Sequence, residues 1–449
     1  MKRAQDSFED VMKGIDDVAV AERKQSYPTR VLVAATLGNA FEWFDFVIYG
    51  YLAVTLSRVF FPAHDSGVAL MLTLATFALG FIMRPLGGIL IGLYADVVGR
   101  RSALTMTIWL MAIATGMIGL APTYAAVGVW APLIVLIARL LQGLAASGEY
   151  GSAVALLVES APPDRKAFYV AWQMASTLLA IVFAGVIGLA GTRLLTPEQL
   201  ESWGWRVPFL IGLLIAPVGY YIRRQIEETL DLSEFARSSW YKDIAGLCRS
   251  KWPQLLAVFA LLTMGAGNFY VTFIYMPTFA VRELGLGLYA PFLSTTVAGL
   301  ISAFGAIFWA SLVDRGVPVR WLLGSAALLL AVIAYPLYAW VIHAPSLGVL
   351  VVVQAALALP GSAIVGLVTV VCAELFPARV RASVLGVSYN ITNTLFGGLA
   401  PLLVSWFVVS TGDKAGAAYY VVAMALSGLA GIAILARRAT LQPQPGFAS

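Results

Sequence analysis

The chain has 449 residues, of which 60% are hydrophobic and only 12% are charged. Soluble domains are about 25% charged, so the composition excludes an ordinary soluble protein and indicates a helical protein that crosses a membrane many times. The net charge of +5 is not clustered as a nucleic-acid partner would require, and Cys248 and Cys372 show no metal-binding spacing.

Residues 1–30 are polar and charged, which predicts a cytoplasmic tail and no cleavable signal peptide. Runs of about 20 apolar residues, the length that crosses a bilayer as a helix, then recur along the chain. We predict an all-α protein with a six-helix half over residues 31–222, a cytoplasmic loop over 223–253, a second six-helix half over 254–436 and a cytoplasmic tail over 437–449. The twelve predicted spans lie near residues 31–61, 68–94, 102–121, 130–158, 167–191, 206–222, 254–281, 290–313, 321–342, 346–373, 382–410 and 416–436.

Basic residues set the predicted orientation, because Lys and Arg are enriched in cytoplasmic loops. Of the 29 Lys and Arg residues, 22 fall in the two tails or in loops on the same side, and five fall near the other side. The remaining two, Arg84 and Arg139, lie inside spans. Both termini are therefore predicted to be cytoplasmic.

The two halves repeat two short sequences at nearly one offset. GLYADVVGRR (92–101) matches ASLVDRGVPVR (310–320), with Asp96 and Asp314 218 positions apart. ESAPPDRKAFY (159–169) matches ELFPARVRAS (374–383), with Glu159 and Glu374 215 apart. Two parallel six-span halves indicate a transporter that binds its substrate between them near the midplane of the bilayer.

The first span contains GNAFEWFDF (38–46), which places two carboxylates in an apolar helix. At about 1.5 Å per residue, Glu42 lies roughly 16 Å into the span, Asp45 about one turn deeper, and Arg84 roughly 15 Å into the second span. A charge at this depth costs at least about 2.5 kcal/mol, so each needs a partner or a function. In the fourth span, Arg139, Gln142 and Glu149 are spaced i, i+3 and i+10, which predicts one shared helix face.

The chemistry of these groups indicates a proton-coupled carrier of anions. Arginine stays charged and binds carboxylates through two parallel donors, so we predict that Arg84 and Arg139 bind the substrate. A buried carboxylate can gain or lose a proton as its solvation changes, so Glu42, Asp45 and Glu149 are the predicted proton-coupling residues. The alternative is that these charges form static ion pairs.

Neutral polar groups at similar depth are predicted to add hydrogen bonds to the substrate. They are Asn39, Gln142, Asn268, Tyr275 and Asn390. Hydrogen bonding between helices is an equally good account of several of them.

Charged residues at the predicted cytoplasmic helix ends suggest ion pairs that close an inner gate, the alternative being that they only set topology. They are Asp96, Arg100, Arg101, Glu159, Arg165, Asp314, Glu374, Arg379 and Arg381.

GLYADVVGRR resembles the G-x-x-x-D-x-x-G-R-R/K signature of the major facilitator superfamily, and RLLQG (139–143) resembles another of its signatures. Five ordered motifs along the whole chain resemble the metabolite:proton symporter family: GNAFEWFDFVIYG, GFIMRPLGG, RLLQGLAASGEYG, WGWRVPF and AELFPARVR. The resemblance implies the major facilitator fold and transport of organic acids or compatible solutes with a proton across the bacterial inner membrane. It also supports the roles of the five buried charges.

Within that family, the segments ALMLTLATFALGFIMRP (69–85), APLIVLIARLLQG (131–143) and TGDK (411–414) resemble the citrate–proton symporters, although EYGSAVALLVE (149–159) is equally similar to the oxoglutarate carriers. The second-half loop DRGVPVR lacks the Gly-Arg-Arg run of the signature, which weakens a gate role for Asp314.

We therefore predict a multi-pass inner-membrane symporter of an organic anion, citrate or another di- or tricarboxylate. It is expected to work as a monomer in the lipid bilayer by alternating access, with no cofactor or metal apart from the coupling proton. A betaine or proline symporter on the same fold is the nearest alternative, and a channel is a more distant one. An enzyme is not expected, because the two histidines lie in predicted outer loops and no catalytic grouping is present.

Overall fold

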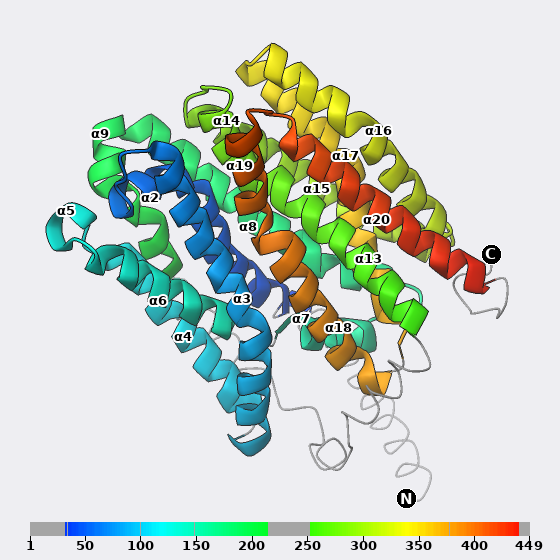
Figure 1. Cartoon of the computed structure of the whole chain (residues 1–449). Coiled ribbons are helices and arrows are strands. Elements are labelled where there is room, and N and C mark those ends of the chain that lie inside the picture. Colours follow the sequence, from blue (N-terminus) through cyan, green and yellow to red (C-terminus); the bar gives the residue numbers. More distant parts are fainter. Residues whose placement is uncertain are drawn as a thin grey trace, which may run out of the picture.

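The computed structural model describes residues 32–213 and 252–439, apart from positions 34, 99, 148 and 377. All regular structure in these ranges is helical (Figure 1), which confirms the predicted all-α class. The predicted N-terminal tail and most of the central loop lie outside the described residues, as does the C-terminal tail after residue 439, since residues 437–439 still belong to the last helix. The count of twelve spans and the cytoplasmic side of both termini stay predictions.

The first half begins with a helix over residues 35–51, which leads directly into α2 (Ala53–Phe60). Its other long helices are α3 (Ser66–Val98), α4 (Arg100–Leu120) and α8 (Lys166–Leu194). The remaining elements are α5 (Tyr124–Val127), α6 (Trp130–Ala145), α7 (Glu149–Ser160), α9 (Pro197–Gln199), the π-helical segment η1 (Leu200–Gly204) and a helix over the described residues 206–213.

The second half contains two predicted spans that are each interrupted by a π-helical segment. The first consists of α13 (Trp252–Phe269), η2 (Tyr270–Tyr275) and α14 (Met276–Arg282). The other consists of α18 (Ala378–Thr392), η3 (Asn393–Gly398) and α19 (Ala400–Thr411). The uninterrupted helices are α15 (Tyr289–Asp314), α16 (Val319–His343), α17 (Leu347–Glu374) and α20 (Gly416–Ala439).

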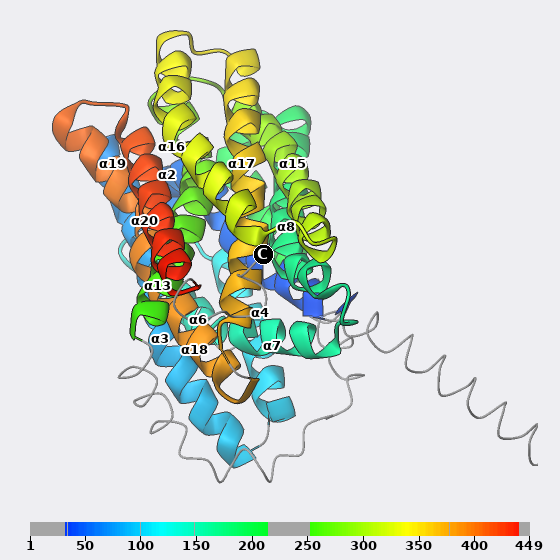
Figure 2. The ribbon, with the colours of Figure 1, turned by 90° about the vertical axis from the view of Figure 1, so that its right-hand side faces the viewer.

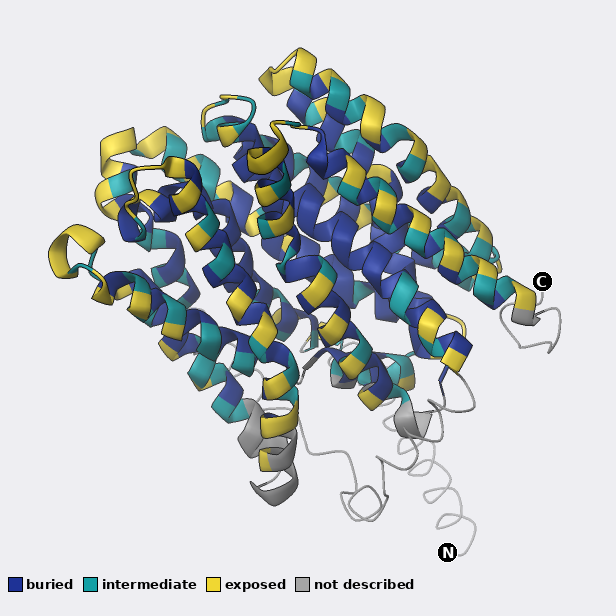
Figure 3. Ribbon diagram, in the orientation of Figure 1, coloured by how far each residue is buried: buried dark blue, intermediate teal, exposed yellow. Residues whose placement is uncertain are grey.

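Eight of the described helices are long and apolar enough to cross a membrane, and two shorter apolar helices cover residues 105–120 and 130–145. Large apolar side chains such as Ile89, Phe304 and Leu328 are exposed on the outer faces of the bundle, where Figure 3 shows much of the exposed surface. Apolar side chains on an outer face are expected of helices that meet lipid rather than water.

The fourth predicted span, 130–158, is wrong as a single helix. α6 ends at Ala145, residues 146 and 147 form a turn, and α7 begins at Glu149. The Ser147 hydroxyl donates to the Leu144 carbonyl at 2.8 Å, a local bond that competes with helix continuation. Figure 2 shows α7 running across the direction of the long helices, where it packs against α18 and α8.

The two halves meet along several helices, so that their buried side chains form one continuous hydrophobic core. α8 of the first half packs along α15 of the second, and α3 packs against η3 and α19. Within the first half, α3 and α6 approach closely at two glycines, because a side chain on Gly143 would collide with the backbone of Gly80. This close approach sets the α3 residue Arg84 and the α6 residue Arg139 on neighbouring helices.

Candidate functional site

The helix over residues 35–51 carries the two predicted carboxylates, and each has a partner on another helix. Residues 42, 45, 46 and 49 are spaced i, i+3, i+4 and i+7, so they share one side of the helix. Glu42 contacts Arg84 of α3, and Asp45 contacts Thr115 of α4. The charges that sequence alone left unexplained therefore sit in two separate groups, one turn apart.

The first group is the ion pair between Arg84 and Glu42, whose Nη2 and Oε1 atoms are 3.3 Å apart. The Arg84 side chain is 1% exposed and that of Glu42 is 11% exposed. The guanidinium carbon of Arg84 lies 4.7, 4.8 and 5.5 Å from the ring centres of Phe81, Phe46 and Trp43. Aromatic faces attract a cation that has lost its water, so these rings stabilise the position of the Arg84 guanidinium inside the bundle.

Arg139 belongs to the second group and is completely buried. Its Nη1 donates to Gln142 Oε1 at 2.7 Å, while its Nε and Nη2 have no hydrogen-bond partner among the described residues. Its guanidinium carbon lies 4.5, 4.8 and 4.9 Å from the ring centres of Tyr49, Phe46 and Phe77. The ring of Phe46 therefore contacts both buried cations.

A chain of hydrogen bonds joins Arg139 to Asp45. Gln142 Nε2 donates to the Thr115 hydroxyl at 3.0 Å, and that hydroxyl donates to Asp45 Oδ2 at 2.5 Å. Asp45 is 5% exposed, and its Oδ1 has no partner among the described residues. Sequence reasoning missed Thr115, whose only signal was a threonine within the apolar run 108–120.

Asn39, a predicted substrate residue of the first half, is bonded within the protein. Asn39 Nδ2 lies 2.7–2.9 Å from Gln173 O, Ser176 Oγ and Thr177 Oγ1, so Asn39 ties its helix to α8. The side chain of Glu149 lies outside the described residues. The break between α6 and α7 removes the reason for expecting Glu149 on the helix face of Gln142.

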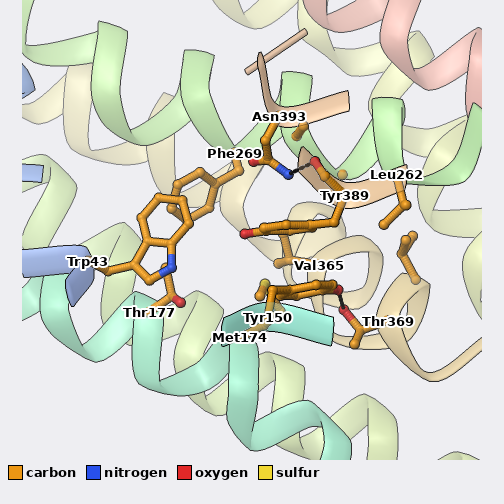
Figure 4. A pocket seen from close by; sticks show the side chains of 13 residues that line it. Trp43, Tyr150, Met174, Thr177, Leu262, Phe269, Val365, Thr369, Tyr389 and Asn393 are labelled. Atoms are coloured by element: carbon orange, nitrogen blue, oxygen red, sulfur yellow. Dashed lines mark hydrogen bonds between the residues drawn. The ribbon is translucent and has the colours of Figure 1, made fainter. Parts of the chain in front are cut away.

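A cavity lies between the halves, lined by residues of both (Figure 4). Two lining residues, Tyr150 of the first half and Tyr389 of the second, stack directly on each other with ring centres 3.4 Å apart and planes 7° apart. The Tyr150 and Thr369 hydroxyls are 2.9 Å apart. The volume of the cavity is about 30 Å³. Its lining is aromatic, apolar and neutral polar: Trp43, Tyr150, Met174, Thr177, Leu262, Gly265, Ala266, Phe269, Val365, Val368, Thr369, Tyr389 and Asn393.

The Arg84 pair lies directly beside this cavity. Its guanidinium carbon lies 5.5 Å from the ring centre of Trp43, which belongs to the cavity lining. The rings around Arg139 are instead Phe46, Tyr49 and Phe77, which are not part of that lining. The two predicted substrate arginines thus differ in their access to the space between the halves.

The predicted second-half residues are buried and contact other groups of the protein. The Asn268 Oδ1 accepts from Thr272 at 3.3 Å, and the Tyr275 ring packs against Phe279. Asn390 Nδ2 donates to the Ser147 carbonyl of the first half at 2.8 Å. Sequence reasoning did not select the cavity residues Tyr150 and Tyr389, because aromatic residues are common in every span.

Of the predicted gate residues, Asp314 makes a clear contact between the halves. Its carboxylate accepts hydrogen bonds from the backbone N–H groups of Ala167 and Phe168, at 2.9 and 2.8 Å. Its partners are therefore the amides at the N-terminus of α8 rather than arginines. Arg165 stacks on Phe168 at 4.4 Å.

For the other predicted gate residues, the structure shows no hydrogen bond or ion pair between the halves among the described side chains. Glu159 and Glu374 are exposed, and Arg381 is half-buried. The side chains of Asp96, Arg100, Arg101 and Arg379 lie outside the described residues.

Residues 35–401 match the model of the Major Facilitator Superfamily. The chain is 35% identical to a citrate–proton symporter of Klebsiella pneumoniae over 413 residues, which cover 92% of this chain and 93% of the relative. It is 32% identical to a putative proline/betaine transporter of Staphylococcus aureus, covering 94% and 90%. The likeness to citrate–proton symporters that the motifs predicted is confirmed.

A solved structure of a D-xylose–proton symporter matches this fold with a TM-score of 0.71 and 18% identity, covering 94% of this chain and 99% of that one. At that identity the match bears on the fold alone, and it agrees with the two bundles that meet along α8 and α15. The family match, the curated relatives and the fold all lead to one assignment. The chain belongs to the major facilitator superfamily.

Proposed function

We propose that the protein is a proton-coupled symporter of a small organic carboxylate, citrate or another di- or tricarboxylate, in a bacterial inner membrane. The observation that carries this proposal is the Arg84–Glu42 pair, a buried cation and a less buried carboxylate beside the cavity between the halves. Similarity to citrate–proton symporters supports the substrate class.

The pair suggests how a proton and an anion share one site. While Glu42 is ionised, it occupies one of the donor groups of Arg84. A proton on Glu42 removes that competitor, and Arg84 is then free to bind a substrate carboxylate with two parallel donors. Proton and anion therefore bind together, which is the thermodynamic requirement of symport.

The remaining roles follow the sequence analysis. Asp45 and Glu149 are the further proposed proton-coupling residues, and Arg139 is the second proposed cation of the site. Hydrogen bonds to substrate are assigned to the neutral polar residues of the second half, Asn268, Tyr275 and Asn390, and the charged helix ends form the gate during alternating access. Because the cavity is too small for an organic acid in this conformation, substrate entry requires the halves to move apart. The protein is proposed to act as a monomer, without a cofactor and without catalysis.

The test is uptake of labelled citrate into proteoliposomes with an imposed inward proton gradient. Unlabelled 2-oxoglutarate, succinate, tricarballylate, betaine and proline serve as competitors. We expect uptake that collapses without the gradient and is blocked by carboxylates only. Citrate uptake that persists without the gradient contradicts symport, and failure to carry any carboxylate contradicts the substrate class.

A betaine or proline symporter is the second candidate, and the cavity itself favours it. Trp43, Phe269, Tyr150 and Tyr389 present aromatic surfaces, and such surfaces bind quaternary ammonium groups well. Similarity to a putative proline/betaine transporter adds support. Uptake of betaine that citrate does not inhibit would establish this candidate in place of the first.

A further inference from the structure

Thr115 lies in a buried series of hydrogen bonds that runs from Arg139 through Gln142 and Thr115 to Asp45. Its side chain, like those of Arg139 and Gln142, is 0% exposed. It comes from α4, whereas Asp45 comes from the first helix and the other two residues come from α6. Three separate elements therefore meet at one hydroxyl group.

All hydrogen bonds of this series donate in the same direction, which follows from the hydrogen atoms that each side chain carries. Arg139 can only donate, so Gln142 accepts through Oε1 and turns its NH2 group to Thr115. The Thr115 oxygen accepts that bond, and its single hydrogen goes to Asp45 Oδ2. Every hydrogen in the chain thus points from the fixed cation toward the carboxylate, an arrangement that stabilises the ionised form of Asp45.

The other carboxylate oxygen is where a proton would go. Oδ1 is buried and without a partner among the described residues, and it faces Gly212, which contributes no side chain. Protonation at Oδ1 leaves the bond to Thr115 in place. Among the described residues, the other charged or titratable groups that interact with Arg139 are Tyr49 on the helix of Asp45, Arg84 on α3 and Tyr270 on η2. Glu42, which pairs with Arg84, lies one turn before Asp45 on the same helix.

We propose that Thr115 is a positioning residue of the proton site: its hydroxyl, held by Gln142, connects Asp45 to the charge of Arg139. This proposal rests on the proposed proton-coupled transport. It assigns Arg139 to the proton site rather than to the substrate, in agreement with the rings that surround Arg139, none of which lines the cavity. Arg84 then remains the cation for the substrate.

The test compares Thr115→Val with Thr115→Ser in proton-driven uptake measured from pH 5 to pH 9. Valine keeps the shape and removes the hydroxyl that bonds the ionised carboxylate, so Asp45 should hold its proton to higher pH. We expect the midpoint of the pH profile to rise by about one pH unit, the size of one hydrogen bond to a charged group. Serine restores the hydroxyl and should restore the wild-type midpoint, and KM for the solute should stay within about twofold of wild type in both variants.

Thr73→Val is the matched control, because Thr73 is a buried threonine whose hydroxyl bonds only the Ala69 carbonyl of its own helix. It should leave the midpoint unchanged. If Thr115→Val does not reach the membrane, Thr115→Ala removes the same hydroxyl without adding bulk and carries the same expectation.

The outcomes separate the two proposals. A wild-type protein that takes up no solute in response to a proton gradient overturns the proposed function and the role of Thr115 with it. Proton-driven uptake in wild type, with an unchanged midpoint when the Thr115 hydroxyl is removed, overturns the role of Thr115 alone. A rise in KM with no change in midpoint also overturns the role of Thr115, because it would mean that these hydrogen bonds act on substrate binding rather than on the proton site.

Discussion

The contact of Asp314 with the N-terminus of α8 leads to a prediction about which conformations the protein prefers. The two hydrogen bonds, at 2.9 and 2.8 Å, join the end of α15 in one half to the start of α8 in the other. A carboxylate at a helix N-terminus is stabilised by unpaired amides and by the helix dipole. Asp314→Ala should destabilise the conformations in which these two helix ends touch by about 1–2 kcal/mol.

That free energy acts on only one side of a two-state equilibrium. Conformations that open at this end lose nothing by the substitution, so their population should rise by a factor of about 5–30. Val365, which lines the cavity, can report the change as Val365→Cys in a chain whose Cys248 and Cys372 are serine. We expect a membrane-impermeant maleimide, applied at the end where Asp314 lies, to label this cysteine about 5–30 times faster in Asp314→Ala.

Glu201→Ala is the control, because Glu201 forms an exposed ion pair with Arg58, and such pairs contribute little to stability. Its labelling rate should match that of the parent chain. Asp314→Asn should fall between the parent and Asp314→Ala, since the amide oxygen still accepts but carries no charge. An unchanged rate in a well-folded Asp314→Ala protein would refute the idea that this contact holds the halves together.

Three further substitutions test the site. Arg84→Ala should abolish anion uptake while the protein still reaches the membrane in normal amount; normal uptake would remove Arg84 from the binding site. Asp45→Asn should uncouple transport from protons, measured as the ratio of protons to substrate taken up, and an unchanged ratio would contradict the role of Asp45. Asn39→Ala breaks the bonds to α8 and should lower the melting temperature of the purified protein, by the loss of about 1–3 kcal/mol, with KM unchanged. A raised KM without loss of stability would instead place Asn39 in the substrate site.

The helices of this fold could be predicted closely from hydropathy. The predicted span 290–313 is the helix Tyr289–Asp314, and the predicted span 416–436 is Gly416–Ala439. The physical reason is that lipid offers no hydrogen bonds, so an apolar run of this length must satisfy its own backbone as a helix. Hydropathy does not detect a turn made of small residues, which is why the break at residues 146 and 147 was missed.

The site was predictable in part for the same reason. Glu42, Asp45, Arg84 and Arg139 stand out because charges in apolar runs are costly and rare. Which of these charges pair depends on the rotation and depth of each helix, and these cannot be derived from the pattern of the sequence alone. Thr115 was out of reach because a single threonine in a span usually bonds its own helix.

The structure therefore separates two groups of charges that sequence alone presented as one. Arg84, paired with Glu42, packs on the cavity residue Trp43, while Asp45, Thr115, Arg139 and Gln142 are not part of the cavity lining. The groups are not independent, since Glu42 and Asp45 are one turn apart on one helix and the Phe46 ring contacts both arginines. Under the proposed roles, a movement of this helix on substrate binding at Arg84 would also change the bond between Asp45 and Thr115, so that one helix would couple substrate binding to proton binding.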